Sequence, residues 1–160
     1  MVAPANNAVD RLLAALPTRC EGGARVAEMG FPTTRDEVLR FTSIAPIAEL
    51  EFTAAAADAK ANLQGCVFSE IDGPQLVFVN GHFSSELSRV GELPPGVEIG
   101  NLASAACEPC EAEDAFGALN ATSFTDGARV RVADGVCFET PIRVYYLSTG
   151  GDGATANIRN

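Results

Sequence analysis

The chain has few basic residues and no long apolar run. Its 160 residues include 11 Lys and Arg against 21 Asp and Glu, which gives a net charge of −10. Nucleic acids and anionic membrane surfaces attract clustered basic side chains, so we expect neither as a partner. No uninterrupted apolar run approaches the roughly 20 residues of a transmembrane helix. The N-terminus also lacks the pattern of a signal peptide, and we therefore expect a soluble, cytoplasmic protein.

Histidine occurs once, as His82, and the five cysteines form no complete ligand set. An odd number of cysteines without a secretory signal predicts reduced thiols. Cys107 and Cys110 form a C-x-x-C pair, which is half of a zinc site or a redox pair. The sequence has no second C-x-x-C and no H-x-x-x-H, and the glutamates beside the thiols disfavour their reactive, ionised form. A loop that leads into a helix is therefore favoured over a small thiol or metal module.

Apolar residues make up 47% of the chain, which is enough for one domain with a real core. In the first 16 residues Val9, Leu12, Leu13 and Leu16 follow the spacing of one helix face, and Pro17 is a stop signal. The sequence thus predicts an amphipathic helix over residues 6–16.

Two more helices are predicted before residue 66. Thr34 and Glu37 have capping-box spacing, so a second helix is expected to begin near Arg35. Residues 54–64 (AAAADAKANLQ) have high helix propensity and are followed by Gly65, a stop signal. The end of the second helix, at residues 40–42, either faces a partner or packs on the core. Packing is the more common outcome for such a helix.

Short strands dominate after residue 65. Asn-Gly between apolar, β-prone residues is the strongest short hairpin signal, and it places His82 at the exit of the turn. The expected elements are strands at 66–71, 75–83 and 97–100 and helical pieces at 102–106 and 113–121. Three more strands are expected at 128–132, 136–139 and 142–147. Periodicity alone leaves a sandwich, a barrel and a β-helix open for this last part.

Three further motifs have ordinary structural explanations. His82 lacks a partner at a spacing that would orient its ring, so a place beside the turn is favoured over a catalytic or ligand role. The glycines of STGGDGATA (148–156) are not followed by the lysine of a phosphate-binding loop. Asp126, Asp134 and Asp152 each precede a glycine, but they are too far apart for one calcium loop, which indicates turn residues.

Three segments in a fixed order resemble a known family. They are GFPTTRDEVLRFTSIAPI (30–47), LVFVNGHFSSELS (76–88) and FGALNATSFTDGARVRVADGVCFETPIRVYYLST (116–149). The set resembles the SufD family, scaffold subunits of the SUF system of iron-sulfur cluster assembly, which are related to SufB. The family often has Trp where this chain has Leu39.

The resemblance implies an α+β fold whose N-terminal helices and small mixed region lead into the first rungs of a right-handed β-helix. The expected divisions are an N-terminal helical segment (1–65), a mixed α+β region (66–125) and a β-helix that the chain begins but does not complete (126–160). Six residues are expected to point into the β-helix: Val130, Val132, Val136, Phe138, Val144 and Tyr146.

The resemblance also implies a function. It is that of a non-catalytic scaffold segment which works with SufB-like and SufC-like subunits. No catalytic, cofactor-binding or metal residue is transferred to this chain, because cluster handling belongs to the full complex. Self-association through the open end of the β-helix is a further expectation. The alternative is a small thiol or metal-binding module centred on Cys107 and Cys110.

Overall fold

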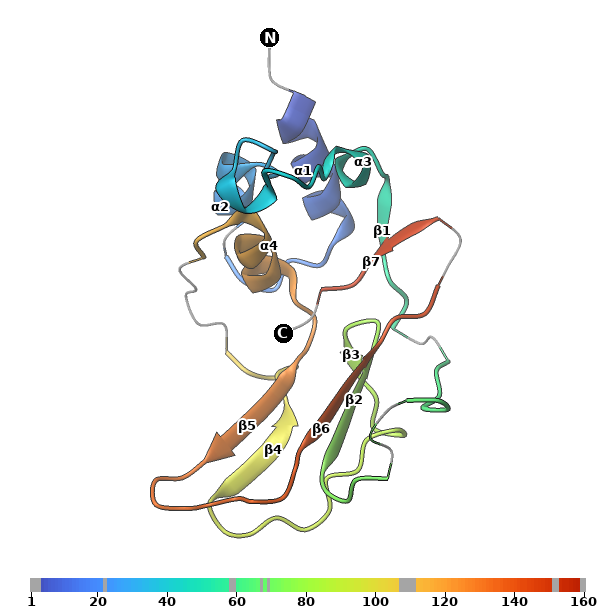
Figure 1. Cartoon of the computed structure of the whole chain (residues 1–160), viewed down its shortest axis with the longest axis vertical. Coiled ribbons are helices and arrows are strands. Elements are labelled where there is room, and N and C mark those ends of the chain that lie inside the picture. Colours follow the sequence, from blue (N-terminus) through green and yellow to red (C-terminus); the bar gives the residue numbers. More distant parts are fainter. Residues whose placement is uncertain are drawn as a thin grey trace. The chain divides into compact units, whose positions relative to one another are not determined.

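The chain forms two compact units, each built from segments that are distant in the sequence. The computed structural model describes residues 4–21, 23–57, 60–66, 68, 70–106, 112–150 and 153–158. The first unit, here called the helical unit, draws on residues 1–55, 106–124 and 150–158. The second, here called the sheet unit, draws on residues 56–105 and 125–149. Together they make a mixed α/β fold with few helices and several small sheets (Figure 1).

The helical unit combines short helices with one small parallel sheet. Its elements are α1 (Pro4–Ala15), α2 (Gly23–Met29), the 3-10 turn η1 (Glu37–Leu39), α3 (Ala45–Ala48), β1 (Phe52–Ala54), α4 (Ala115–Ser123) and β7 (Ala154–Ala156). Strand β1 pairs in parallel with β7, so that Phe52 lies opposite Ala154. Among the described helices, none is both long enough and apolar enough to span a bilayer.

The core of the helical unit lies between α1, α2 and α4, which are neighbours in Figure 1. The predicted apolar face of α1 is confirmed, because Val9, Leu12 and Leu16 are all buried. Helix α4 confirms the helix expected at 113–121 with a small shift. Its N-cap, Asp114, accepts a hydrogen bond from the Gly117 amide at 2.8 Å, which satisfies one free donor of the first turn.

The helix predicted to begin near Arg35 is wrong. Only the three residues of η1 are helical there, and none of them is buried. The local turn is organised by Asp36, whose carboxylate accepts hydrogen bonds from the amide (2.6 Å) and the hydroxyl (3.2 Å) of Thr33. A turn held by its own polar groups needs no buried apolar face. The helix in this part of the chain is instead α2, which the sequence did not indicate.

The helix predicted over residues 54–64 is also wrong for the residues that the structure describes. Strand β1 ends at Ala54, and the next amide, of Ala55, donates to the carbonyl of Ala156 at 2.9 Å. The high helix propensity of an alanine run amounts to a few tenths of a kcal/mol per residue. Pairing with a distant strand therefore overrides it.

The sheet unit holds the most deeply buried strand. Its elements are β2 (Gln75–Val79), β3 (His82–Phe83), β4 (Val97–Asn101), β5 (Ala128–Val132) and β6 (Arg143–Leu147). Strand β2 lies between β3, which is antiparallel to it, and β6, which is parallel. Strands β4 and β5 form a separate antiparallel pair.

The sequence of β2 explains its central position. A strand that is covered on both faces reads as a continuous apolar run, and Leu76, Val77 and Phe78 are fully buried. The Phe78 ring stacks on Tyr146 of β6 at 5.2 Å between centroids and meets Phe83 of β3 edge-on at 5.7 Å. These contacts tie the three strands together through one side chain.

Three other predictions for this unit are wrong. The described residues of the range 66–71 form a turn, in which the amide of Ile71 donates to the carbonyl of Phe68, and no strand. Residues 136–139 form no strand, and residues 102–106 form a turn and no helix. The strands near 75–83, 97–100, 128–132 and 142–147 are confirmed. The described strands do not by themselves display a right-handed β-helix.

Candidate functional site

The Asn-Gly hairpin forms as the sequence predicts. Val79 pairs with His82 across a two-residue turn, in which Asn80 and Gly81 have φ values of 51° and 83°. Both values match the turn type that follows the twist of the flanking strands. His82 is half-buried beside a cleft of about 610 Å³. Its side chain has no hydrogen bond or ion pair with any described residue, so nothing there orients its ring for proton transfer.

The long-range hydrogen bonds of this hairpin are made by Asn80. This residue is only 4% exposed, and its amide nitrogen donates to the carbonyl of Ala56 (2.9 Å) and the hydroxyl of Thr149 (2.7 Å). Its side-chain oxygen accepts from the Thr149 amide (2.9 Å), and its own backbone amide donates to Leu147 (2.8 Å). Asn80 thus joins the hairpin to the residues that follow β6. The sequence offered no signal for these long-range partners.

The cysteines differ from the expectation of reduced thiols. Cys20 is disulfide-bonded, so that expectation is wrong for this residue, whereas Cys66 and Cys137 are free. Cys107 and Cys110, the centre of the alternative metal-binding hypothesis, lie outside the described residues. Within the described part of the chain, no three His, Cys, Asp or Glu side chains are grouped to hold a metal ion.

The aspartates that precede glycines can be placed in two of three cases. Asp126 is buried, and its carboxylate accepts hydrogen bonds from the amides of Leu102 and Gly127, both at 2.8 Å. The bond to Leu102 is long-range and residue 126 forms a β-bridge in the segment between α4 and β5, so the turn predicted at Asp126 is wrong. Asp134 lies in the turn that follows β5, and Asp152 lies outside the described residues.

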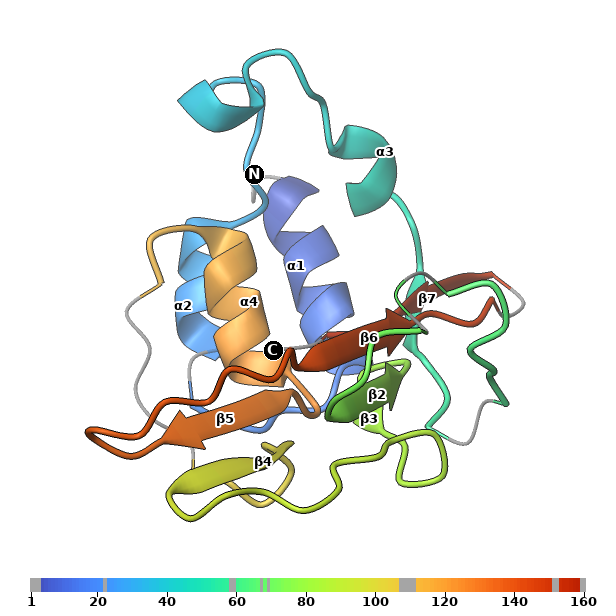
Figure 2. The ribbon, with the colours of Figure 1, turned by 60° about the horizontal axis from the view of Figure 1, so that its bottom comes forward.

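The largest exposed apolar side chains of the helical unit lie on one segment, residues 33–50, here called the exposed arch. Val38 and Phe41 are 94% and 91% exposed, and Ile47 and Leu50 are each about half exposed. Figure 2 shows η1, in this segment, standing away from α1, α2 and α4, whereas α3 contacts α1. The expected packing of residues 40–42 on the core is therefore wrong. An exposed cluster of this kind is typical of a partner-facing surface.

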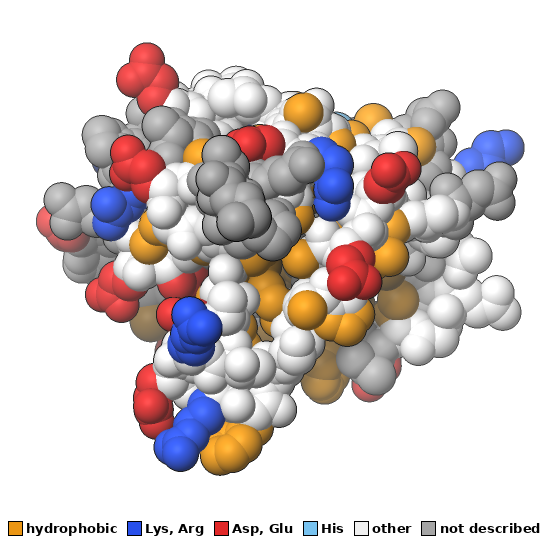
Figure 3. Space-filling view, turned by 90° about the horizontal axis from the view of Figure 1, so that it is seen from above, with side chains coloured by type: hydrophobic (Ala, Val, Ile, Leu, Met, Phe, Trp, Pro, Cys, Tyr) orange, Lys and Arg blue, Asp and Glu red, His pale blue; other side chains and the backbone are white. Residues whose placement is uncertain are grey.

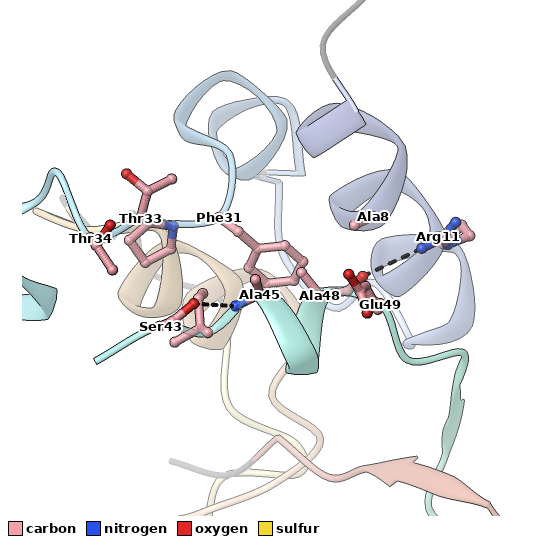
Figure 4. Close-up of a pocket in the computed structure, with 11 residues that line it drawn as sticks. Ala8, Arg11, Phe31, Thr33, Thr34, Ser43, Ala45, Ala48 and Glu49 are labelled. Atoms are coloured by element: carbon pink, nitrogen blue, oxygen red, sulfur yellow. Dashed lines mark hydrogen bonds between the residues drawn. The ribbon is translucent and has the colours of Figure 1, made fainter. Parts of the chain in front are cut away.

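An apolar cleft of about 550 Å³ lies between the exposed arch and α1. Figure 3 shows hydrophobic side chains gathered around a hollow on the face seen from above the helices. In the close-up of Figure 4, Arg11 and Glu49 lie at one end of the cleft and Thr33 and Thr34 at the other. The Arg11 guanidinium donates to the carbonyl of Ala48 at 3.4 Å, which links α1 to the last turn of α3.

The chemistry of this cleft suits binding. Its lining residues are Ala8, Arg11, Phe31, Pro32, Thr33, Thr34, Ser43, Ile44, Ala45, Ala48 and Glu49. They include hydroxyls, but no histidine or cysteine. The Ser43 hydroxyl accepts from the Ala45 amide at 3.4 Å and serves the start of α3. What the geometry offers is a shaped apolar surface beside an exposed aromatic side chain.

Comparison with known proteins places the chain in a family. Residues 12–144 match the family model described as the SufBD protein N-terminal region. Because the match covers most of the chain, the protein belongs to this family.

A curated relative agrees with this assignment. The iron-sulfur cluster assembly SufBD family protein of Synechocystis sp. is 25% identical to this chain over 136 residues. The alignment covers 77% of this chain and 30% of that protein. The chain therefore spans about a third of the length of this relative. The resemblance predicted from three segments is confirmed at the level of the SufB and SufD family.

Proposed function

We propose that this chain is the N-terminal part of a SufD-like, non-catalytic scaffold subunit of iron-sulfur cluster assembly. Membership of the SufBD family over residues 12–144 is the observation that carries the proposal. SufB-like and SufC-like subunits are the proposed partners, in a cytoplasmic complex. The segment itself holds no cofactor in this proposal, and the cluster is the cargo of the whole complex.

We further propose that the last strands begin a right-handed β-helix. Strands β5, β6 and β7 follow one another in the sequence, yet each belongs to a different sheet. Consecutive strands of a solenoid coil behave in this way, because each joins a different face of the stack. Two of the three, β6 and β7, pair in parallel with earlier strands, as stacked coils do. The antiparallel pairing of β4 with β5 marks the start of the stack in this proposal.

The exposure of side chains on β5 and β6 supports the same proposal. Val130, Val132 and Val144 were predicted to be buried, but they are 45%, 41% and 37% exposed. Each of these strands has a neighbour on one side only among the described strands. Apolar side chains on an unpaired edge strand promote aggregation, and proteins usually cover such an edge. A further layer of strands would cover them.

Co-expression tests the proposed complex. The gene product, tagged and at its full encoded length, is produced with the SufB-like and SufC-like proteins of the same genome and purified. We expect both subunits to copurify in a defined stoichiometry by native mass spectrometry. Purification of the tagged protein alone, from cells in which all three are present, would overturn the proposal.

Sedimentation of the 160-residue chain tests whether the unpaired edges of β5 and β6 associate with another copy. We expect it to associate with itself, and the double substitution Val130→Lys and Val144→Lys to restore a monomer, because a charge on an edge strand blocks pairing. Val38→Lys is the matched control, since Val38 is equally apolar and more exposed but lies on η1. A chain that is already monomeric, with β5 and β6 fully protected from hydrogen exchange, would show that these edges need no cover.

A further inference from the structure

A second apolar cleft, of about 570 Å³, lies on the helical unit and is rimmed by carboxylates. Its walls come from three short segments: residues 29–33 at the end of α2, residues 36–39 around η1, and residues 113–116 at the start of α4. We call it the acidic cleft. Four of its lining residues are Asp or Glu, and none is Lys or Arg. It is a different opening from the cleft of Figure 4, although Phe31, Pro32 and Thr33 contribute to both.

The apolar part of the acidic cleft is open to solvent. The rings of Phe31 and Phe116 are 6.2 Å apart between centroids, and Phe116 remains 43% exposed. Val38 stands on the rim with 94% of its surface exposed, and η1 has no buried residue. Phe31 packs against the core of the unit, whereas Phe116 and Val38 are not part of it. Their exposure is therefore not explained by folding.

The four carboxylates divide into two kinds. Asp36 and Asp114 serve the fold, because Asp36 accepts from the amide and hydroxyl of Thr33 and Asp114 caps α4. The side-chain carboxylates of Glu37 and Glu113 have no hydrogen bond or ion pair with any described residue, and both residues are exposed. Two free negative charges thus flank an apolar cleft in a chain that already carries a net charge of −10.

This combination selects one class of occupant. Phosphate groups of nucleic acid or of lipids are repelled by the carboxylates. A metal ion is not favoured either, since the described residues contain no suitable ligand group. An apolar side chain with Lys or Arg beside it would fill the cleft and pair with both free glutamates. Such charge complementarity also raises the rate of association and excludes acidic competitors.

We propose that the acidic cleft docks a short basic and apolar segment of a partner protein. The cleft volume lies within the range that holds a few side chains. The proposal is independent of the role in cluster assembly, because it rests only on the shape and charge of this surface. It places a protein-binding site on the helical unit, whereas the strand edges considered above belong to the sheet unit.

Three capped peptides test the proposal on the ¹⁵N-labelled chain by NMR. The probe is KLFK, the charge-reversed control is ELFE, and the apolar-to-polar control is KSSK. At millimolar concentration we expect KLFK to shift the amides of residues 29–33, 36–39 and 113–116. We expect both controls to bind at least about tenfold more weakly, because each lacks one of the two complementary features.

Two pairs of variants localise the binding. Glu37→Lys with Glu113→Lys should weaken KLFK binding roughly tenfold, since each exposed ion pair contributes about twofold to fivefold. The matched control, Glu92→Lys with Glu139→Lys, changes the net charge equally on exposed residues of the sheet unit. It should leave the affinity nearly unchanged.

The second pair tests the apolar rim. Val38→Ser should weaken binding severalfold. Phe41→Ser should not, because Phe41 is as exposed as Val38 but does not line this cleft.

Several results would overturn the proposal. Equal binding of KLFK and ELFE would show that the carboxylates do not discriminate between basic and acidic peptides. Chemical-shift changes confined to the cleft of Figure 4 would show that the peptide binds there and not in the acidic cleft. If none of the three peptides shifts any amide signal, the acidic cleft does not bind such a segment. Self-association of the chain that is lost in Val38→Ser would show that the occupant is a second copy and not a basic segment.

Discussion

Replacing Asn80 with Ala is expected to destabilise the sheet unit strongly. The substitution removes three side-chain hydrogen bonds, two to Thr149 and one to Ala56. Each is worth about 1 kcal/mol when both partners are paired. Alanine at a φ of 51° adds roughly 1 kcal/mol of backbone strain. We therefore expect a loss of about 3–4 kcal/mol in the free energy of unfolding.

A second substitution separates the two contributions. Asn80→Gly loses the same hydrogen bonds but accepts a positive φ without strain, so it should cost about 2–3 kcal/mol. A difference of about 1 kcal/mol between the two variants would measure the strain alone. Because the chain has no tryptophan, urea unfolding is best followed by far-UV circular dichroism. Hydrogen exchange of the β2 amides then reports the sheet unit separately.

The result that would refute this reasoning is an Asn80→Ala variant within about 0.5 kcal/mol of the wild type, the range of an ordinary surface change. Such a result would mean that the bonds to Ala56 and Thr149 contribute nothing net. Equal losses in the alanine and glycine variants would support the contribution of the hydrogen bonds and refute the contribution of backbone strain.

Three other predictions concern the backbone and the thiols. Gly81→Val should cost about 1–3 kcal/mol in a thermal or urea melt, because valine resists a φ of 83°, while His82→Asn beside it should stay within about 0.5 kcal/mol. Gly73→Ala should cost about 2 kcal/mol or more, since a Cβ there would collide with the backbone of the loop that leads into β6; a soluble variant with an unchanged melt would contradict this. Cys20→Ser should lower stability by about 2–4 kcal/mol and Cys137→Ser, at a free exposed thiol, should not; equal melts for the two would argue against a stabilising disulfide.

Local signals in the sequence were sufficient for elements whose stability is mainly local. The apolar spacing of α1 and the Asn-Gly turn between β2 and β3 each depend on residues that are close in the sequence. The apolar, β-prone run of β2 likewise predicted a strand, and the structure shows it to be buried. The family could be predicted too, because three ordered segments keep the same local features.

Elements that depend on distant partners could not be predicted. Strand β1 exists because it pairs with β7, about a hundred residues later, and neither is distinctive alone. The failure at residues 54–64 has the same cause, since helix propensity is a weak preference that tertiary pairing overrides. The helix expected near Arg35 shortened to η1 because Asp36 and Thr33 satisfy each other in a turn.

The candidate binding surfaces show the same division. The sequence by itself determined that the chain is acidic and rich in apolar residues, that its fold is of mixed α/β type, and to which family it belongs. Composition and short motifs can be recognised without knowing the tertiary contacts. Only the tertiary structure decided that Phe41 and Val38 are exposed and that Glu37 and Glu113 share the rim of one cleft. Exposure and proximity depend on how residues 29–39 meet the start of α4. That arrangement is set by burial of the helical core, which no single segment encodes.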